Sequence, residues 1–133
     1  MTAPGHYILA ADTVVAVGRR ILPKAEDADT VRACLGLLSG RRHHVYTAIT
    51  LRTPEGHMSH RLVDTAVILA RLTPAQVEAY VATGEGLGKA GGYALQGKAA
   101  AFIRHLSGSP SAVIGLPLHE LTQLLRGRGY LPS

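Results

Sequence analysis

Asp12 is the residue of this chain whose setting most strongly suggests chemistry, because its carboxylate interrupts an apolar stretch. The segment ILAADTVVAVGRRIL, residues 8–22, has the apolar and β-branched composition of a buried strand. A buried carboxylate without a partner is costly, so it normally has a cation, a metal ion or a catalytic function. Thr13 beside it and Lys24 after a predicted hairpin could complete a polar pocket. The structural alternative is a salt bridge between Asp12 and Lys24.

A second candidate is the glycine-rich segment GEGLGKAGGYALQG, residues 84–97. It contains the spacing G-x-G-x-x-G, but it follows a predicted helix, whereas the dinucleotide fingerprint follows a strand. It also approaches a phosphate-binding P-loop, but it lacks the first glycine and the Ser/Thr that should follow Lys89. What remains is a flexible segment with exposed backbone that carries Lys89, Tyr93 and Gln96. Such a segment either lines a ligand site or forms a long turn.

Other reactive side chains give weaker indications. His43 and His44 are adjacent, and His57 and His60 are three residues apart, so each pair would point to opposite faces of a strand. We therefore do not predict a histidine metal cluster, and we interpret these histidines as solvated or capping residues. The serines between residues 107 and 111 lack a G-x-S-x-G elbow, which argues against a serine hydrolase.

The elements that must position these residues follow from hydrophobic periodicity and turn residues. Strands are predicted at residues 7–17, 21–22, 43–53, 60–72 and 99–106. Helices are predicted at residues 27–38, 74–84 and 117–126. The first two strands and the next two should form antiparallel hairpins. Asp27 is the expected N-cap of the first helix, and Thr73 with Gln76 should form a capping box on the second. The segment SGSPS is a predicted turn.

Composition limits the class of protein. The 133 residues predict one domain over residues 1–133, and 47% hydrophobic with 17% charged residues indicates a packed globule. The net charge of +5 favours an anionic ligand, either a small phosphorylated molecule or a nucleic acid. The single cysteine, Cys34, excludes an intrachain disulfide and suits a reducing compartment. The first residues contain neither a basic signal region nor a membrane span, so we expect a soluble, cytoplasmic protein.

Two blocks of the sequence resemble the Maf family of nucleoside triphosphate pyrophosphatases, once named septum formation inhibitors. The blocks run from AADTVV to AITL, residues 10–51, and from GEGLGK to LHEL, residues 84–121. The resemblance implies an α/β fold with a mixed, elongated β-sheet flanked by helices. It also implies a cleft that takes a nucleoside triphosphate with a divalent cation, Mg²⁺ or Mn²⁺. Family members cleave between the α- and β-phosphates and release a nucleoside monophosphate and pyrophosphate.

The resemblance carries over to individual residues. It implies that Asp12 is the proton acceptor and lies beside the metal ion, and that Lys24 and Lys89 complete the catalytic set by binding phosphate. Thr13 and Gln96 match positions linked to substrate selection, and the pair implies a pyrimidine nucleotide such as dTTP or UTP. A hydroxyl and an amide suit this function because both can donate and accept hydrogen bonds at a base edge.

The chain departs from the family pattern in several places. Family members open with a segment S-x-S-P-R-R that meets the phosphates, and no such segment precedes Asp12 here, so we expect an N-terminally truncated Maf-like domain. Loss of the strand in that segment should leave a sheet edge unpaired, which favours a homodimer. Within the motifs, LPKA replaces LGKP, Gly88 replaces an aspartate, Ala94 a glycine and Ala112 an asparagine.

Three functional interpretations stay open from the sequence. We favour a pyrophosphatase acting on a pyrimidine nucleoside triphosphate. The second is a nucleotide-binding remnant of the same fold with impaired catalysis. The third, a basic nucleic-acid-binding module, is the weakest, because one phenylalanine and no tryptophan leave few aromatic rings on which bases could stack.

Overall fold

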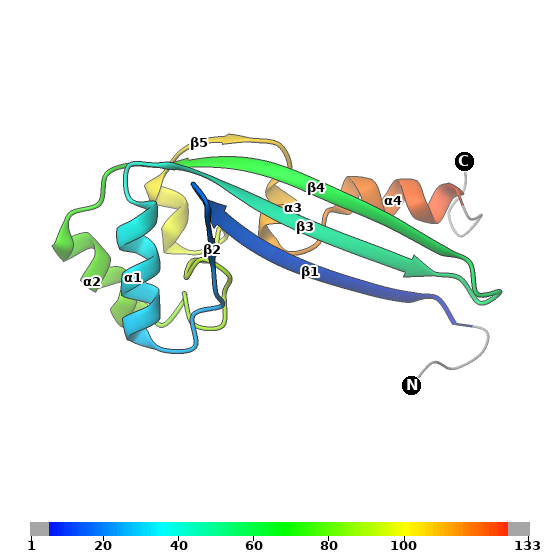
Figure 1. Cartoon of the computed structure of the whole chain (residues 1–133), viewed down its shortest axis with the longest axis horizontal. Helices are drawn as coiled ribbons and strands as arrows, with labels where there is room; N and C mark the ends of the chain where they lie inside the picture. Colours follow the sequence, from blue (N-terminus) through cyan, green and yellow to red (C-terminus); the bar gives the residue numbers. More distant parts are fainter. Residues whose placement is uncertain (1–5, 128–133) are drawn as a thin grey trace.

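A computed structural model describes residues 6–127 as a long β-sheet with helices gathered against it (Figure 1). The strands are β1 (Ile8–Val17), β2 (Arg20–Leu22), β3 (Arg42–Arg52), β4 (Met58–Leu69) and β5 (Ile103–Ser107). The helices are α1 (Ala28–Leu38), α2 (Pro74–Thr83), the 3₁₀ helix η1 (Lys98–Phe102), α3 (Pro110–Ile114) and α4 (Leu118–Gly127). The α/β architecture with an elongated sheet flanked by helices, expected from the resemblance, is confirmed.

The strand order is β2-β1-β3-β4-β5, and within residues 6–127 each of the four pairings is antiparallel. The mixed character that the resemblance implied is therefore not seen in this part of the sheet. Hairpins join β1 to β2 and β3 to β4, and a hairpin can only pair strands antiparallel. The longer connections between β1 and β3 and between β4 and β5 also return the chain in the antiparallel direction. The two hairpins that the sequence predicted are confirmed.

Helices α1 and α2 begin and end where the sequence indicated. The Asp27 carboxylate accepts a hydrogen bond from the N–H of Thr30 at 2.7 Å and caps α1. Thr73 and Gln76 form the predicted capping box on α2. An ion pair from Arg32 on α1 to Glu78 on α2 joins the two helices. In the described range, none of the helices combines the length and the apolar character needed to span a bilayer.

Two predictions about the C-terminal half need correction. The strand predicted at 99–106 begins only at Ile103, and the alanine-rich start forms η1, because Ala-Ala-Ala has none of the β-branched residues that favour a strand. The segment SGSPS is not only a turn. Its Ser109 caps α3 by accepting a hydrogen bond from the N–H of Ala112, and Pro110 occupies the first helical position, where its fixed φ is favourable.

One face of the sheet is covered and the other is open to solvent, as is common for antiparallel sheets. On the covered face, the strands pack against α1 and α2 at one end and against α4 towards the other end (Figure 1). These contacts form a larger apolar cluster around Leu35 and Leu38 and a smaller one of Ile49, Leu51 and Leu124. The covered face beside the larger cluster is the part of the sheet left for a site.

The outer edge of β1 is only partly paired. β2 pairs with β1 at residues 15–17, so in the described part of the chain residues 8–14 of β1 have a neighbouring strand on the β3 side only. Unpaired N–H and C=O groups along such an edge are free to bind another chain or a ligand. The homodimer expected from this edge stays a prediction.

His43 is fully buried on β3, which corrects its interpretation as a solvated residue. Its Nε2 lies 2.6 Å from the hydroxyl oxygen of Tyr93, and its Nδ1 has no hydrogen-bond partner in the described structure. Burial first, and the neighbouring charge of His44 second, lower the pKa of His43 to about 4. The imidazole is therefore neutral in the folded protein near pH 7.

We predict that the protein loses stability on acidification and that His43 causes this loss. In the unfolded chain its pKa returns to 6.5, so the unfolded state binds the proton first as the pH falls. The free energy of unfolding is therefore highest above pH 6.5. It falls by about 3 kcal/mol as the pH is lowered from 6.5 to 4. Urea unfolding at several pH values should show a flatter profile for His43→Gln. His105→Gln, at an exposed histidine on β5, should keep the wild-type slope, and an equal flattening in both variants would contradict the prediction.

Candidate functional site

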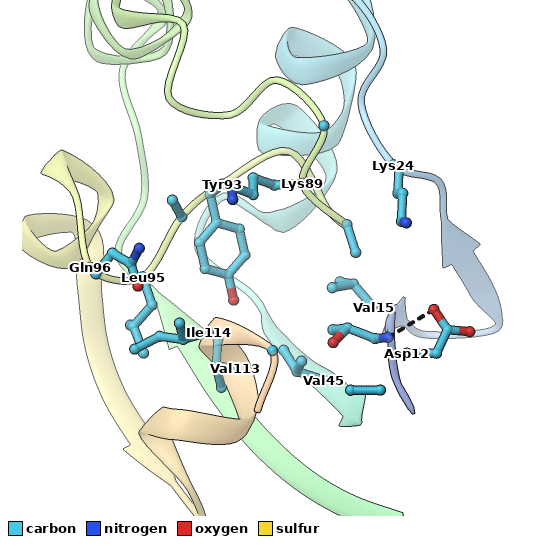
Figure 2. Close-up of a pocket in the computed structure, with 16 residues that line it drawn as sticks. Asp12, Val15, Lys24, Val45, Lys89, Tyr93, Leu95, Gln96, Val113 and Ile114 are labelled. Carbon is cyan, nitrogen blue, oxygen red and sulfur yellow. Dashed lines mark hydrogen bonds between the residues drawn. The ribbon is translucent and has the colours of Figure 1, made fainter. Parts of the chain in front are cut away.

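A cavity of about 250 Å³ lies on the covered face of the sheet, against the larger apolar cluster (Figure 2). All five residues that the sequence analysis singled out for a site line this cavity: Asp12, Thr13, Lys24, Lys89 and Gln96. They come from β1, from the link between β2 and α1, and from the glycine-rich segment. The fold thus brings together residues separated by more than seventy positions in the sequence.

A short backbone ladder holds the two lysines at the cavity. Lys24 and Ala90 form an isolated antiparallel β-bridge. Beside it, the N–H of Ala25 donates to the Lys89 carbonyl at 3.1 Å, and the N–H of Gly88 donates to the Ala25 carbonyl at 2.8 Å. A further bond runs from the N–H of Gly91 to the carbonyl of residue 23 at 3.2 Å. The positions of Lys24 and Lys89 are therefore coupled through backbone hydrogen bonds.

Hydrogen bonds anchor the glycine-rich segment, whose flexibility stays a prediction. The Tyr80 hydroxyl accepts a hydrogen bond from the N–H of Ala94 at 3.0 Å, and the Glu85 carboxylate accepts one from the N–H of Lys98 at 2.8 Å. Within the segment, a Cβ on Gly86 would lie 2.2 Å from the carbonyl oxygen of Gly92, so only glycine fits there. Residues 84–97 therefore form one wall of the cavity.

Asp12 is exposed, which corrects the expectation of a buried carboxylate. The strand pattern was misleading because β2 ends before it reaches Asp12, so this part of β1 is a sheet edge. One carboxylate oxygen accepts a hydrogen bond from the N–H of Thr13 at 3.0 Å. No ion pair joins Asp12 to Lys24, both of which are described, so the salt-bridge alternative is not supported. The carboxylate is thus available to a ligand.

The polar groups are spread along the cavity. In Figure 2, Asp12 and Lys24 lie on one side, Gln96 lies on the opposite side, and Lys89 and Tyr93 lie between them. Tyr93 is nearly fully buried, and its hydroxyl is held by His43 at 2.6 Å. Burial raises the pKa of Tyr93, so this hydroxyl stays protonated. One side of the cavity therefore offers charged groups, and the other a neutral amide.

Sequence reasoning missed Thr47, a fully buried residue of β3 directly opposite Thr13 in the sheet register. Its hydroxyl donates to the Ala112 carbonyl at 2.6 Å and lies 3.4 Å from the Thr13 hydroxyl. A signal was present, since Thr47 is the polar member of an alternating row whose neighbours Val45 and Ile49 are apolar. A polar residue on the buried face of a strand must find a hydrogen-bond partner, and here the partner is Ala112, which directly precedes the cavity-lining residues 113–115.

The donor set suits a metal ion that arrives with a phosphorylated ligand. Within residues 6–127, no cluster of three His, Cys, Asp or Glu side chains is arranged to hold a metal. Mg²⁺ is commonly held by one or two carboxylates together with substrate phosphates and water, and Asp12 supplies one exposed carboxylate at the cavity. The residues present therefore fit a shared site of this type.

The sequence matches known proteins over most of its length. A sequence model described as Maf-like protein matches residues 1–128. The dTTP/UTP pyrophosphatase of Granulibacter bethesdensis is 62% identical over 124 residues, which cover 93% of this chain and 58% of the relative. The proteins of the same name from Gluconobacter oxydans and Rhodospirillum rubrum are 62% and 58% identical, covering 91% and 98% of this chain and 57% and 62% of theirs. The chain spans about three fifths of the length of these relatives.

We predict that Gly86→Ala destabilises the protein by about 2 kcal/mol or more, because the new methyl group would press on the backbone of Gly92. The matched control is Gly36→Ala, at an exposed helical position with open space around it, which should stabilise α1 by about 1 kcal/mol. Urea unfolding monitored by circular dichroism measures both. An unchanged midpoint for Gly86→Ala would mean that the loop can shift without cost.

Proposed function

The chain belongs to the family of Maf-like proteins, and on this premise we propose that it is a cytoplasmic nucleoside triphosphate pyrophosphatase. The substrate is a pyrimidine nucleoside triphosphate such as dTTP or UTP, and the products are the nucleoside monophosphate and pyrophosphate. The observation that carries the proposal is the cavity itself. The cavity is lined by the carboxylate of Asp12, by two lysines and by the amide of Gln96.

The triphosphate binds on the side of Asp12 and Lys24 and extends past Lys89. An ammonium group stabilises phosphate as a compact point charge, and two of them offset much of the negative charge of a triphosphate. The backbone ladder between residues 23–25 and 88–91 keeps Lys24 and Lys89 at a fixed separation before the ligand arrives. Less conformational entropy is then lost when the nucleotide binds.

Asp12 acts as the general base. Its carboxylate accepts a proton from water, the water oxygen forms a bond to the α-phosphorus, and pyrophosphate leaves with the electron pair of the bridging bond. The N–H of Thr13 holds one carboxylate oxygen at 3.0 Å and leaves the other for this task. Asp12 and the phosphate oxygens would also hold a divalent cation, which when bound neutralises phosphate charge and makes water more acidic.

The base extends from Thr13, which lies beside Asp12 on β1, towards Gln96 on the opposite side of the cavity. Gln96 presents an amide there, which can donate to and accept from a base edge at once. Thr13 contributes a hydroxyl from the sheet and lines the cavity together with Gly115 at the end of α3. The names of the relatives, dTTP/UTP pyrophosphatases, support a pyrimidine at this position.

The first test is Asp12→Asn. Because Asp12 is exposed, this variant should fold as the wild type does and still bind nucleotide, but turnover of UTP and dTTP with Mg²⁺ or Mn²⁺ should fall by about two orders of magnitude or more. Pyrophosphate release measures the rate. Asp64→Asn, at an exposed aspartate paired with His44, is the matched control and should keep wild-type turnover.

Three results would count against the proposal. Equal turnover by Asp12→Asn and wild type would remove Asp12 from the reaction. Nucleotide binding without any turnover by the wild type would identify a binding remnant. Salt-sensitive binding to DNA with no effect of nucleotide would favour the nucleic-acid module.

The second test is Gln96→Ala. An amide that reads a base edge should, when removed, reduce the preference for UTP and dTTP over ATP and GTP more than it reduces turnover of the preferred substrate. The measurement is kcat/KM for the four triphosphates. Gln123→Ala, at an exposed position on α4, is the control. A uniform fall for all four nucleotides would assign Gln96 to phosphate positioning.

A further inference from the structure

Two threonine hydroxyls and a backbone carbonyl form a chain that ends at the cavity. Thr47 is fully buried, and its Oγ1 lies 2.6 Å from the carbonyl oxygen of Ala112. The same Oγ1 lies 3.4 Å from Oγ1 of Thr13, which lines the cavity. Thr13 and Thr47 are direct cross-strand partners on β1 and β3, so the sheet fixes the distance between them. The chain thus links the start of α3 to the cavity wall.

The direction of this chain follows from counting protons. A hydroxyl has one proton to donate and two lone pairs that accept, whereas a carbonyl oxygen can only accept. The Thr47 proton must therefore point to Ala112, and Thr47 presents a lone pair to Thr13. Two lone pairs facing each other repel, so the Thr13 proton points to Thr47. What Thr13 shows to the cavity is then a pair of acceptor sites.

We infer that Thr47 is a positioning residue that makes Thr13 a hydrogen-bond acceptor towards the nucleotide base. This inference rests on the proposed function, which supplies a pyrimidine in the cavity. Uracil and thymine carry a ring N–H at N3, and this donor complements an acceptor. Cytosine has an unprotonated N3 at the same place, which would leave two acceptors facing each other. Thr47 thereby selects uracil and thymine against cytosine, although it does not touch the base.

An acceptor fixed in this way discriminates strongly, because the wrong base leaves a polar group unpaired in a partly buried site. A freely rotating hydroxyl would not discriminate between the bases, since it could turn and donate its proton to N3 of cytosine. Removing the Thr47 hydroxyl gives Thr13 this freedom. The expected signature is therefore a loss of selectivity, with binding of the preferred base changed less.

The test measures binding of UMP and CMP, the monophosphate products, by titration calorimetry, so that it does not depend on turnover. The wild type should bind UMP about tenfold or more tightly than CMP, and Thr47→Val should bring the two affinities to within about threefold. Thr47→Ser restores the hydroxyl and should restore the preference. N3-methyl-UMP, which lacks the donor, should bind the wild type as weakly as CMP does.

Thr65→Val is the matched control for loss of a buried hydroxyl. Thr65 is equally buried on the neighbouring strand β4 and hydrogen-bonds to Ser109 at the start of α3. This variant should perturb α3 while keeping the preference for UMP. If Thr47→Val fails to fold because the Ala112 carbonyl loses its partner, Thr47→Cys provides the second variant, because its thiol is only a weak donor and acceptor and should reduce the preference for UMP while Thr13 stays in place.

The outcomes separate the inference from the proposed function. A wild-type preference that survives in Thr47→Val, or a wild type that binds UMP and CMP equally or not at all, overturns the inference. If the wild type nevertheless releases pyrophosphate from UTP, the proposed function is retained and only the inference about Thr47 is rejected. A preference for UMP that disappears in Thr47→Val but not in Thr65→Val supports the inference, even in a chain that shows no turnover.

Discussion

The site depends on a single constraint, the short backbone ladder that ties residues 23–25 to residues 88–91. It joins the link after β2 to the glycine-rich segment and so closes the cavity on the side opposite the sheet. The ladder requires close packing of backbone on β1: a Cβ on Gly91 would lie 3.0 Å from Val15, and its φ of 73° is one that side chains rarely adopt. Glycine there provides the contact by which β1, the lysines and the loop form one site.

Local sequence patterns predicted most of the elements, because these are set by neighbouring residues. Caps at Asp27 and Thr73, the stop at Gly84 and the two hairpins depend on interactions within a few positions. The failures have the opposite origin. Asp12 is exposed because a neighbouring strand is short, and His43 is buried because Tyr93, fifty positions away, packs on it. Alternation along β3 puts His43 in the same buried row as Val45 and Ile49, but it does not identify the distant partner of a polar side chain.

For the candidate site, residue types combined with the family resemblance identified five cavity-lining residues, but not the groups that orient them. Thr47 and His43 lie on the buried face of β3, where hydropathy alone predicts apolar contacts. A polar side chain is retained there at a cost unless its hydrogen bonds are satisfied. Thr47 satisfies its own through Ala112, whereas His43 leaves Nδ1 without a partner in the described structure. These positions couple the stability of the core to the shape of the cavity.

The unequal size of the two apolar clusters has a consequence for motion. The cluster around α1 and α2 is extensive, whereas α4 is held mainly through Leu124 against Ile49 and Leu51. Segments with few buried contacts open at lower free energy than the rest of a protein, as separate cooperative units. Opening of the α4 unit would uncover Ile49 and Leu51, whereas the cavity would keep its apolar wall, because Val15, Val45 and Val113 pack in the larger cluster. Fraying of the far end of the sheet is then separated from the cavity, which stays closed by the more extensive of the two clusters.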